Sequence, residues 1–130
     1  MQDFGQRTRR LIRGRRAEAS GRDAEGVASA ALEREGWVVL ARRARTPAGE
    51  IDLVAERDGV LAFVEVKARP SLSEAAFALG KRQRARLVAA AECWLAANPG
   101  HGAAGVRFDV VIVAADGTAR RIADAFRIGD

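Results

Sequence analysis

Residues 49–69 read GEIDLVAERDGVLAFVEVKAR, which is two apolar runs separated by Asp58-Gly59. An Asp-Gly pair between alternating apolar runs is the strongest short-range signal of a β-hairpin. If these two residues form the loop, Arg57 faces Val60, and the pairing of every residue before and after them is set. This hairpin decides the fold, because its register sorts the side chains of both strands onto two faces of a sheet.

The two faces of the predicted hairpin differ in composition. One face is apolar throughout and belongs against a helix; it consists of Ile51, Leu53, Ala55, Val60, Ala62, Val64 and Val66. The other face is apolar near the turn, where it carries Val54, Leu61 and Phe63. At its far end it carries four charged residues: Glu50, Asp52, Glu65 and Lys67.

This register predicts that Asp52 lies directly across from Glu65, and Glu50 across from Lys67. Like charges directly opposed on two strands are destabilising, so a raised pKa, the nearby lysine or a bound cation must offset the repulsion. Mg²⁺ prefers carboxylate oxygens and keeps several waters, so two acids on adjacent strands suffice as protein ligands. The alternative is an ordinary Glu50–Lys67 salt bridge, with the other two acids turned towards water.

Two acids and a lysine are also a minimal set for hydrolysing a phosphodiester. A metal ion lowers the pKa of its bound water and stabilises the charge that develops on a phosphoryl oxygen. Lys67 follows Glu65 by two residues on the same face of the strand, where it is placed to hold or polarise such a water.

The segments around the hairpin predict a helix, three strands, a second helix and two more strands. The first helix is expected from Asp23, as its N-cap, to Gly36 at its C-terminal end. The second helix begins near Glu74 or near Gly80 and continues through Ala97. The chain is therefore expected to be α/β, with a mixed sheet of about five strands flanked by helices. The strands outside the hairpin are expected at 37–44, 106–113 and 119–126.

Asp52, followed on the next strand by Glu65-Val66-Lys67, resembles the D…(D/E)-x-K signature of restriction-endonuclease-like nucleases. With RTPAGEIDLV, FVEVKAR, a basic helix containing AECWL, and RFDVV, the chain resembles the YraN family. These are uncharacterised bacterial proteins (uncharacterised protein family 0102) similar to archaeal Holliday-junction resolvases. The resemblance covers about residues 25–113, and it implies the restriction-endonuclease-like fold of the PD-(D/E)xK superfamily.

The resemblance also implies a role for each residue of the signature. Asp52 and Glu65 would be the metal-binding acids, with the Val66 carbonyl as a further ligand of Mg²⁺ or Mn²⁺. Lys67 would be the catalytic lysine. Glu25 would be an accessory acid that reaches the metal from the first helix.

The chain departs from the family pattern at two positions. Ile51 stands where the superfamily's name implies proline, which is usual in the YraN family. Arg43 stands where asparagine is expected. This second difference can alter a contact at the end of a strand, but it leaves the metal-binding set intact.

The intact set favours a metal-dependent nuclease that hydrolyses phosphodiester bonds in nucleic acid. DNA, branched DNA included, is the expected substrate. The alternatives are a nucleic-acid-binding module without turnover and a protein-interaction role, because one fold hosts many functions. A homodimer is expected by analogy with junction resolvases, which pair two active sites.

The formal charge of +5 is concentrated at the N-terminus. Residues 1–22 carry seven arginines against Asp3 and Glu18, whereas basic and acidic residues are equal in number over residues 23–130. We therefore expect a basic arm, 1–22, on a single charge-balanced nuclease-like domain, 23–130. Such arms attract nucleic acid through phosphate contacts. A disordered, merely solubilising extension is the alternative.

Two further groups of basic residues are candidate phosphate contacts. One group lies near the start of the second helix: Lys81, Arg82, Arg84 and Arg86. The other lies in the strand after Trp37: Arg42, Arg43 and Arg45. If the second helix begins near Gly80, the residues of the first group lie beside the free backbone N–H groups of its first turn, which also favour phosphate. A solvated face is the alternative for both groups.

Composition bounds the remaining possibilities. No apolar run approaches the roughly 20 residues of a membrane helix, and the single cysteine, Cys93, excludes an internal disulfide framework. We expect a cytoplasmic protein without a signal peptide. Asp109 is expected to form a structural pair with Arg107, and His101 is expected to be solvated.

Overall fold

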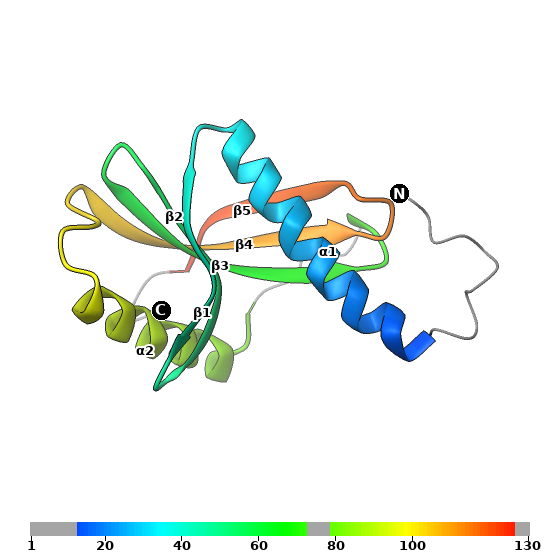
Figure 1. Ribbon diagram of the computed structural model, residues 1–130, viewed down its shortest axis with the longest axis horizontal. Coiled ribbons are helices and arrows are strands. Elements are labelled where there is room, and N and C mark those ends of the chain that lie inside the picture. The colour runs from blue at the N-terminus through cyan, green and yellow to red at the C-terminus, as the bar shows by residue number, and fades with distance from the viewer. Residues whose placement is uncertain (1–12, 73–78, 127–130) are drawn as a thin grey trace.

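The computed structural model describes the backbone of residues 13–72 and 79–126, and the side chains within these ranges from residue 24 onward. The order of elements is the predicted one of a helix, three strands, a helix and two strands (Figure 1). Their bounds are α1 (Arg13–Arg34), β1 (Val38–Thr46), β2 (Gly49–Arg57), β3 (Val60–Arg69), α2 (Lys81–Ala97), β4 (Gly105–Ala114) and β5 (Ala119–Phe126).

The five strands form one mixed sheet in the order β1-β2-β3-β4-β5. Neighbouring strands are antiparallel except β3 and β4, which run parallel. Parallel neighbours require a crossover, and α2 supplies it. The predicted α/β fold is confirmed, and the architecture is consistent with a restriction-endonuclease-like fold.

The hairpin turn has the backbone that its sequence predicts. Asp58 and Gly59 both have positive φ, at 52° and 81°, as a two-residue type I′ turn requires. The predicted register is confirmed from the Arg57–Val60 pair to the Leu53–Val64 pair. The Gly59 carbonyl also accepts a hydrogen bond from the Ala104 N–H at 2.9 Å, which ties the turn to the segment that enters β4.

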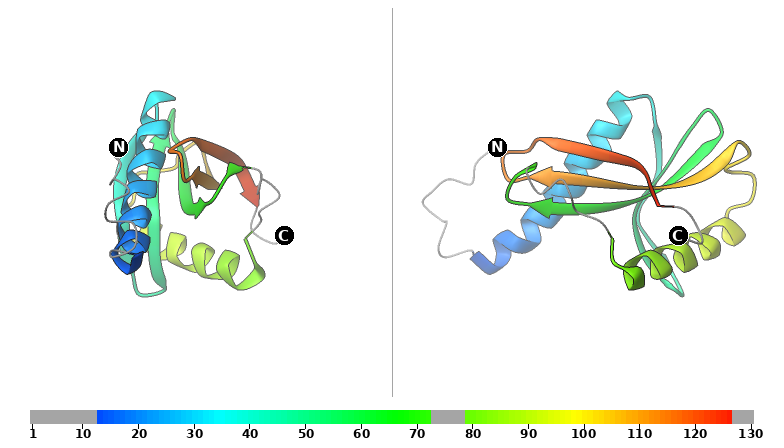
Figure 2. Two further views of the ribbon diagram at one scale, coloured as in Figure 1. Left: turned by 90° about the vertical axis from the view of Figure 1, so that its right-hand side faces the viewer. Right: turned by 180° about the vertical axis from the view of Figure 1, so that it is seen from behind.

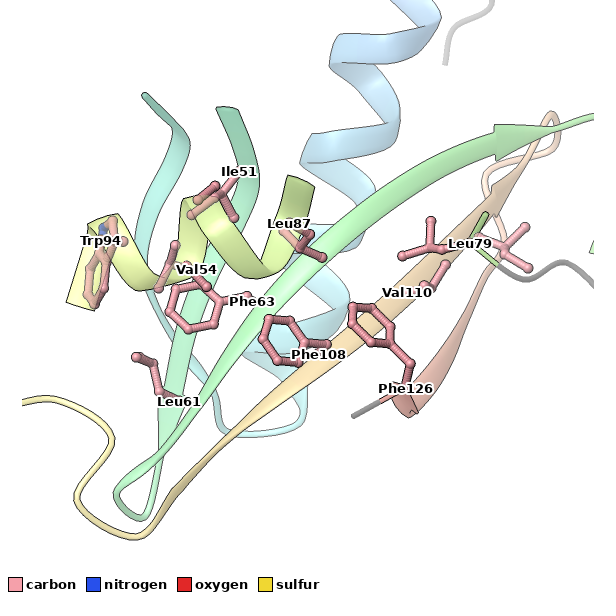
Figure 3. Close-up of a cluster of buried hydrophobic side chains, with 13 residues drawn as sticks. Ile51, Val54, Leu61, Phe63, Leu79, Leu87, Trp94, Phe108, Val110 and Phe126 are labelled. Atoms are coloured by element: carbon pink, nitrogen blue, oxygen red, sulfur yellow. The ribbon is translucent and has the colours of Figure 1, made fainter. Parts of the chain in front are cut away.

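Both faces of the hairpin are covered by helices, which lie on opposite sides of the strands (Figure 2). The α1 side packs Ala24, Ala28 and Leu32 against Leu53, Ala55, Ala62 and Val64. The α2 side packs Leu87, Ala90, Ala91 and Trp94 against Val54, Leu61, Phe63 and Phe108 (Figure 3). Phe63 is at the centre of this second core, with the rings of Trp94 and Phe108 each 5.9 Å from its own.

The hairpin departs from the prediction beyond the Leu53–Val64 pair, where the ladder between β2 and β3 ends. From there β2 pairs only with β1, through Ala44–Ile51 and Arg45–Glu50, while β3 continues along β4. Ile51 packs into the α2 core, although alternation from Leu53 places it on the α1 face (Figure 3). The predicted placement of Ile51 is therefore wrong, because the strand changes face where it leaves its partner.

The helix boundaries also differ in part from the prediction. The first helix begins at Arg13, so Asp23 lies inside α1 and is not its N-cap. Arginine, alanine and glutamate have high helix propensity, which favours extending the helix past the part that packs on the sheet. Residues 13–22 of the predicted arm are thus helical, and residues 1–12 lie outside the described residues. For the second helix, Gly80 is the N-cap, as one of the two predictions had it.

Candidate active site

The candidate site is built around Asp52, at the point where β2 and β3 separate. Its Oδ2 accepts a hydrogen bond from the Val66 N–H at 2.8 Å. The carboxylate thus takes a backbone donor of β3 just beyond the last β2–β3 ladder pair. Because the Asp52 carboxylate accepts the Val66 N–H, β2 and β3 can separate here without leaving that N–H unpaired.

The environment of Asp52 disfavours the ionised form of its carboxyl group. Burial raises its pKa to about 6 from 3.8, against the lowering effect of the Val66 hydrogen bond. The charges of Glu65 and Glu25 raise this pKa further, and Lys67 lowers it. Three carboxylates therefore act on one another here, and a cation at this point would stabilise the ionised form of Asp52.

Glu65 and Lys67 lie next to one another on β3. The Lys67 Nζ is 3.1 Å from the Glu65 Oε2, and both side chains are mostly covered by the protein. The predicted opposition of Lys67 to Glu50 is wrong, because β2 has turned away from β3 at this level. Glu50 instead lies across from Arg45 on β1, with its Oε2 3.6 Å from the Arg45 Nε.

Glu25 reaches the same region from α1. Ala24 and Ala28 are buried in the α1 core, which fixes the helix and leaves Glu25 at its margin, 17% exposed. Its Oε1 accepts a hydrogen bond from the Arg43 Nε at 3.0 Å. The first helix thus brings a third acid to the Asp52 site.

Arg43 has an unusual backbone conformation for an arginine. Its φ is +50°, in the left-handed region that a side chain with a Cβ disfavours and that asparagine tolerates best after glycine. It lies between the Arg42–Leu53 and Ala44–Ile51 pairs of the sheet, at the level of Asp52. The hydrogen bond to Glu25, and then the charge of Glu25, raise the pKa of the guanidinium.

The donor set suits a hard divalent cation. Within the described residues, no three Asp, Glu, His or Cys side chains are already gathered as a metal site. The ligands on offer are the Asp52 and Glu65 carboxylates, and Mg²⁺ and Mn²⁺ accept such a pair because water and carbonyl oxygens complete their coordination. Burial, and after it the charges of Glu65 and Glu25, raise the pKa of Asp52, and a bound cation would favour its ionised form.

The arginines of β1 point in different directions. The Arg42 Nη2 donates a hydrogen bond of 3.0 Å to the Oγ of Ser29, a buried residue of α1. Arg43 binds Glu25, as described. The side chain of Arg45 is 90% exposed beside Glu50. The strand therefore presents one open cation and two that hold α1.

The basic residues of α2 lie at its first turns. Lys81, Arg82 and Arg86 are exposed. Arg84 is partly covered, and its Nη1 donates to the Leu79 carbonyl at 3.3 Å. The stem of Arg86 packs on Gly49, where an added Cβ would lie 3.3 Å from the Arg86 Cγ and Cδ. The basic end of α2 and the β1–β2 turn are therefore neighbours (Figure 1).

With this geometry established, comparison with known proteins places the chain. The model of "Uncharacterised protein family UPF0102" matches residues 24–113, which is more than half of the chain. This chain belongs to UPF0102. A UPF0102 protein of Granulibacter bethesdensis is 56% identical over 125 residues, covering 96% of this chain and 79% of the relative. A UPF0102 protein of Rhodopseudomonas palustris is 49% identical over 107 residues, covering 82% of each chain.

The family prediction is thus confirmed for this UPF0102 chain. The structure brings Glu25, Asp52, Glu65 and Lys67 into one region, and their chemical roles stay predictions. The sequence reasoning missed the Arg43–Glu25 pair; the signal available was an arginine at a position where asparagine was expected. In the part of the chain that the structure describes, no helix is long and apolar enough to cross a membrane.

Two predictions outside the site have clear outcomes in this UPF0102 chain. Asp109 is fully buried and pairs with Arg107 at 2.8 Å, as predicted, and it also pairs with Arg121 at 3.1 Å. The prediction for His101 is wrong: its Nδ1 lies 2.9 Å from the Glu56 Oε1, and its ring lies 5.6 Å from Trp94. The Glu56–His101 contact joins β2 to the loop before β4, and the Asp109 cluster joins β4 to β5.

Proposed function

We propose that this protein is a divalent-metal-dependent nuclease of the PD-(D/E)xK superfamily. The observation that carries the proposal is the meeting of Asp52, Glu65 and Lys67 at the parting of β2 and β3, with Asp52 raised in pKa by burial and by neighbouring carboxylates. A carboxyl group with a shifted pKa beside other charged side chains is typical of catalytic sites. Glu25 of α1 supports the proposal as an accessory acid.

Each residue has a role in this proposal. Asp52 and Glu65 would hold Mg²⁺ or Mn²⁺, with the Val66 carbonyl as a further ligand. When bound, the ion would acidify a water and stabilise charge on the phosphoryl oxygens. The Val66 N–H keeps Asp52 in place. Lys67 orients Glu65 through their ion pair and brings a positive charge to the attacking water and the phosphate.

The proposed substrate is nucleic acid, with DNA, branched DNA included, as the first candidate. Arg45 and the exposed cations of α2 supply phosphate contacts, and these recognise backbone and shape with no base-reading element required. A homodimer, a cytoplasmic location and phosphate binding by the basic residues 1–22 belong to the same proposal.

The test is an incubation of purified protein with labelled linear and branched DNA and RNA, with chelator, Mg²⁺ or Mn²⁺. Cleavage is expected only with metal, and Asp52→Asn, Glu65→Gln and Lys67→Ala are each expected to abolish it. Glu50→Gln serves as the matched acid control and is expected to cleave like wild type. Wild-type cleavage by a folded variant of any of the first three would sink the assignment.

A second candidate is a nucleic-acid-binding module without turnover. Glu25 and Glu65 each already have a basic partner, in Arg43 and Lys67, so this site can exist without a metal. The same assay separates the two functions. Binding that is independent of metal, with no cleavage of any substrate, would favour the binding module.

A further inference from the structure

We propose that Arg43 is a built-in counter-ion of the candidate metal centre, which competes with the divalent ion for Glu25 and thereby sets the affinity of the site for metal. This inference rests on the proposed metal-dependent function. It concerns a residue that no motif of the site includes.

Arg43 and Glu25 meet across the packing of α1 on the sheet. Arg43 belongs to β1 and Glu25 to α1, and their side chains meet at 3.0 Å between Nε and Oε1. Arg43 lies between two residue pairs that place it at the level of Asp52. The guanidinium therefore stands beside the carboxylate that would be the third acid of the metal centre.

The backbone of Arg43 is in a conformation that does not favour arginine. The chain holds an arginine at φ +50°, where most residues with a Cβ are disfavoured. Arg43 lies inside β1, and the strand conformation itself does not require a long side chain at this position. The feature that an arginine provides here, and that asparagine lacks, is a charge that reaches Glu25.

The acids around the site are each near a cation. Glu25, Glu50 and Asp52 all act on Arg43, and each stabilises its charged form. Glu65 already has Lys67, and Glu50 has Arg45. Arg43 is thus the cation assigned to Glu25. A divalent ion that binds the same acids is therefore repelled by the positive charge of Arg43.

The two side chains of the pair differ in exposure. The Arg43 side chain is 49% exposed, whereas Glu25 is 17% exposed. The guanidinium can therefore leave Glu25 by turning into water, while the carboxylate stays where the buried face of α1 holds it. Arg43 yields to the ion, and Glu25 does not move.

The test is a calorimetric titration with Mn²⁺ of wild type, Arg43→Asn, Arg43→Lys, Glu25→Gln and the double variant that combines Glu25→Gln with Arg43→Asn. Asparagine suits φ +50° and removes the charge, so this variant is expected to fold and to bind Mn²⁺ about fivefold more tightly, the size expected for releasing a solvent-exposed ion pair. Arg43→Lys retains the charge and is expected to stay near wild type. In the Glu25→Gln background, Arg43→Asn is expected to have little further effect.

Arg120→Asn is the control for net charge, because Arg120 is exposed on β5, at the opposite edge of the sheet from β1. It is expected to bind Mn²⁺ like wild type. An affinity of Arg43→Asn that equals or falls below that of wild type, with circular dichroism showing a folded protein, overturns the inference. So does an equal gain in Arg120→Asn, which would mean a general charge effect.

The failure of this inference and that of the proposed function are distinguishable. If Mn²⁺ binds but no nucleic acid is cleaved, the nuclease proposal fails, and the comparison of variants still decides the role of Arg43. If cleavage requires metal but Arg43→Asn binds it no better, only the inference about Arg43 falls. If neither wild type nor Arg43→Asn binds Mn²⁺, both fall.

Discussion

Replacing Asp52 by asparagine tests the electrostatic core of the site without any substrate. Burial raises the pKa of Asp52 to about 6 in the folded protein, against 3.8 as the ordinary value. The folded state therefore favours the protonated carboxyl. The stability that protonation of Asp52 contributes is fully present below about pH 3.8 and is lost as the pH rises through about 6.

The magnitude follows from these two pKa values. A difference of about two pKa units corresponds to about 3 kcal/mol between the limits of low and high pH. Between about pH 5 and about pH 7.5, linkage gives a loss of about 1.4 kcal/mol. The Asp52→Asn variant lacks this titration. In metal-free protein it is expected to gain about 1.4 kcal/mol on wild type over that interval, or about 5 °C in melting temperature for a domain of this size.

A divalent ion is expected to reverse the order of stability of wild type and Asp52→Asn. At 100 times its dissociation constant, an ion that binds only the folded state adds about 2.7 kcal/mol. Wild type is expected to melt higher with Mn²⁺, whereas Asp52→Asn is expected to lose most of that increase. Glu50→Gln is the control, and it is expected to keep the increase because Glu50 lies beside Arg45 on β1, outside the proposed ligand set.

The assay is a set of thermal melts of the three proteins at both pH values, with chelator and then with Mn²⁺. A difference between wild type and Asp52→Asn that stays constant with pH would refute the argument from burial. Failure of wild type to respond to millimolar Mn²⁺ would refute the metal site. Loss of the Mn²⁺-induced increase in melting temperature in Glu50→Gln would show that Glu50 contributes to metal binding, which contradicts the proposed ligand set.

Three further predictions address the scaffold and the binding surfaces. Phe63→Ala is expected to cost about 3–5 kcal/mol of unfolding free energy in denaturant titrations, because the ring is fully buried between two others; a loss below about 1 kcal/mol would contradict this. Gly49→Ala is expected to weaken nucleic-acid binding and to lower the melting temperature, because φ is +140° and the new Cβ meets the stem of Arg86. Gly26→Ala, in α1 with open space around it, is the control and is expected to stabilise by about 0.5–1 kcal/mol. Deleting residues 1–22, which carry seven arginines, is expected to flatten the salt dependence of nucleic-acid affinity, and an unchanged slope would leave these residues a solubilising role.

Local chemistry explains why much of the fold was predictable. A two-residue turn with positive φ at both positions has few compatible sequences, and Asp58-Gly59 is one of the best of them. The turn sets the register, and the register places Phe63 and Val64 on opposite faces. Each face then needs a helix, and the two apolar helical patterns of the chain supply them.

The candidate site was predictable in its members but not in its contacts. The alternation of β3 places Glu65 and Lys67 on one face, and their ion pair follows from that spacing. The predicted opposition across the hairpin failed because it assumed that β2 and β3 stay paired to their ends. They part beyond the Leu53–Val64 pair, towards the start of β2, where β3 follows β4 and the Asp52 side chain accepts the Val66 N–H.

The sequence by itself therefore determined the order of the elements, the hairpin turn, the two apolar faces and the residues of the signature, because each depends on neighbours along one or two strands. Only the tertiary structure decided where the strands separate, that Ile51 packs on the α2 side, and that Arg43 holds Glu25 from β1. These contacts join residues far apart in the chain. Their geometry depends on the twist of the sheet and the packing of a helix across it, and no local pattern encodes either.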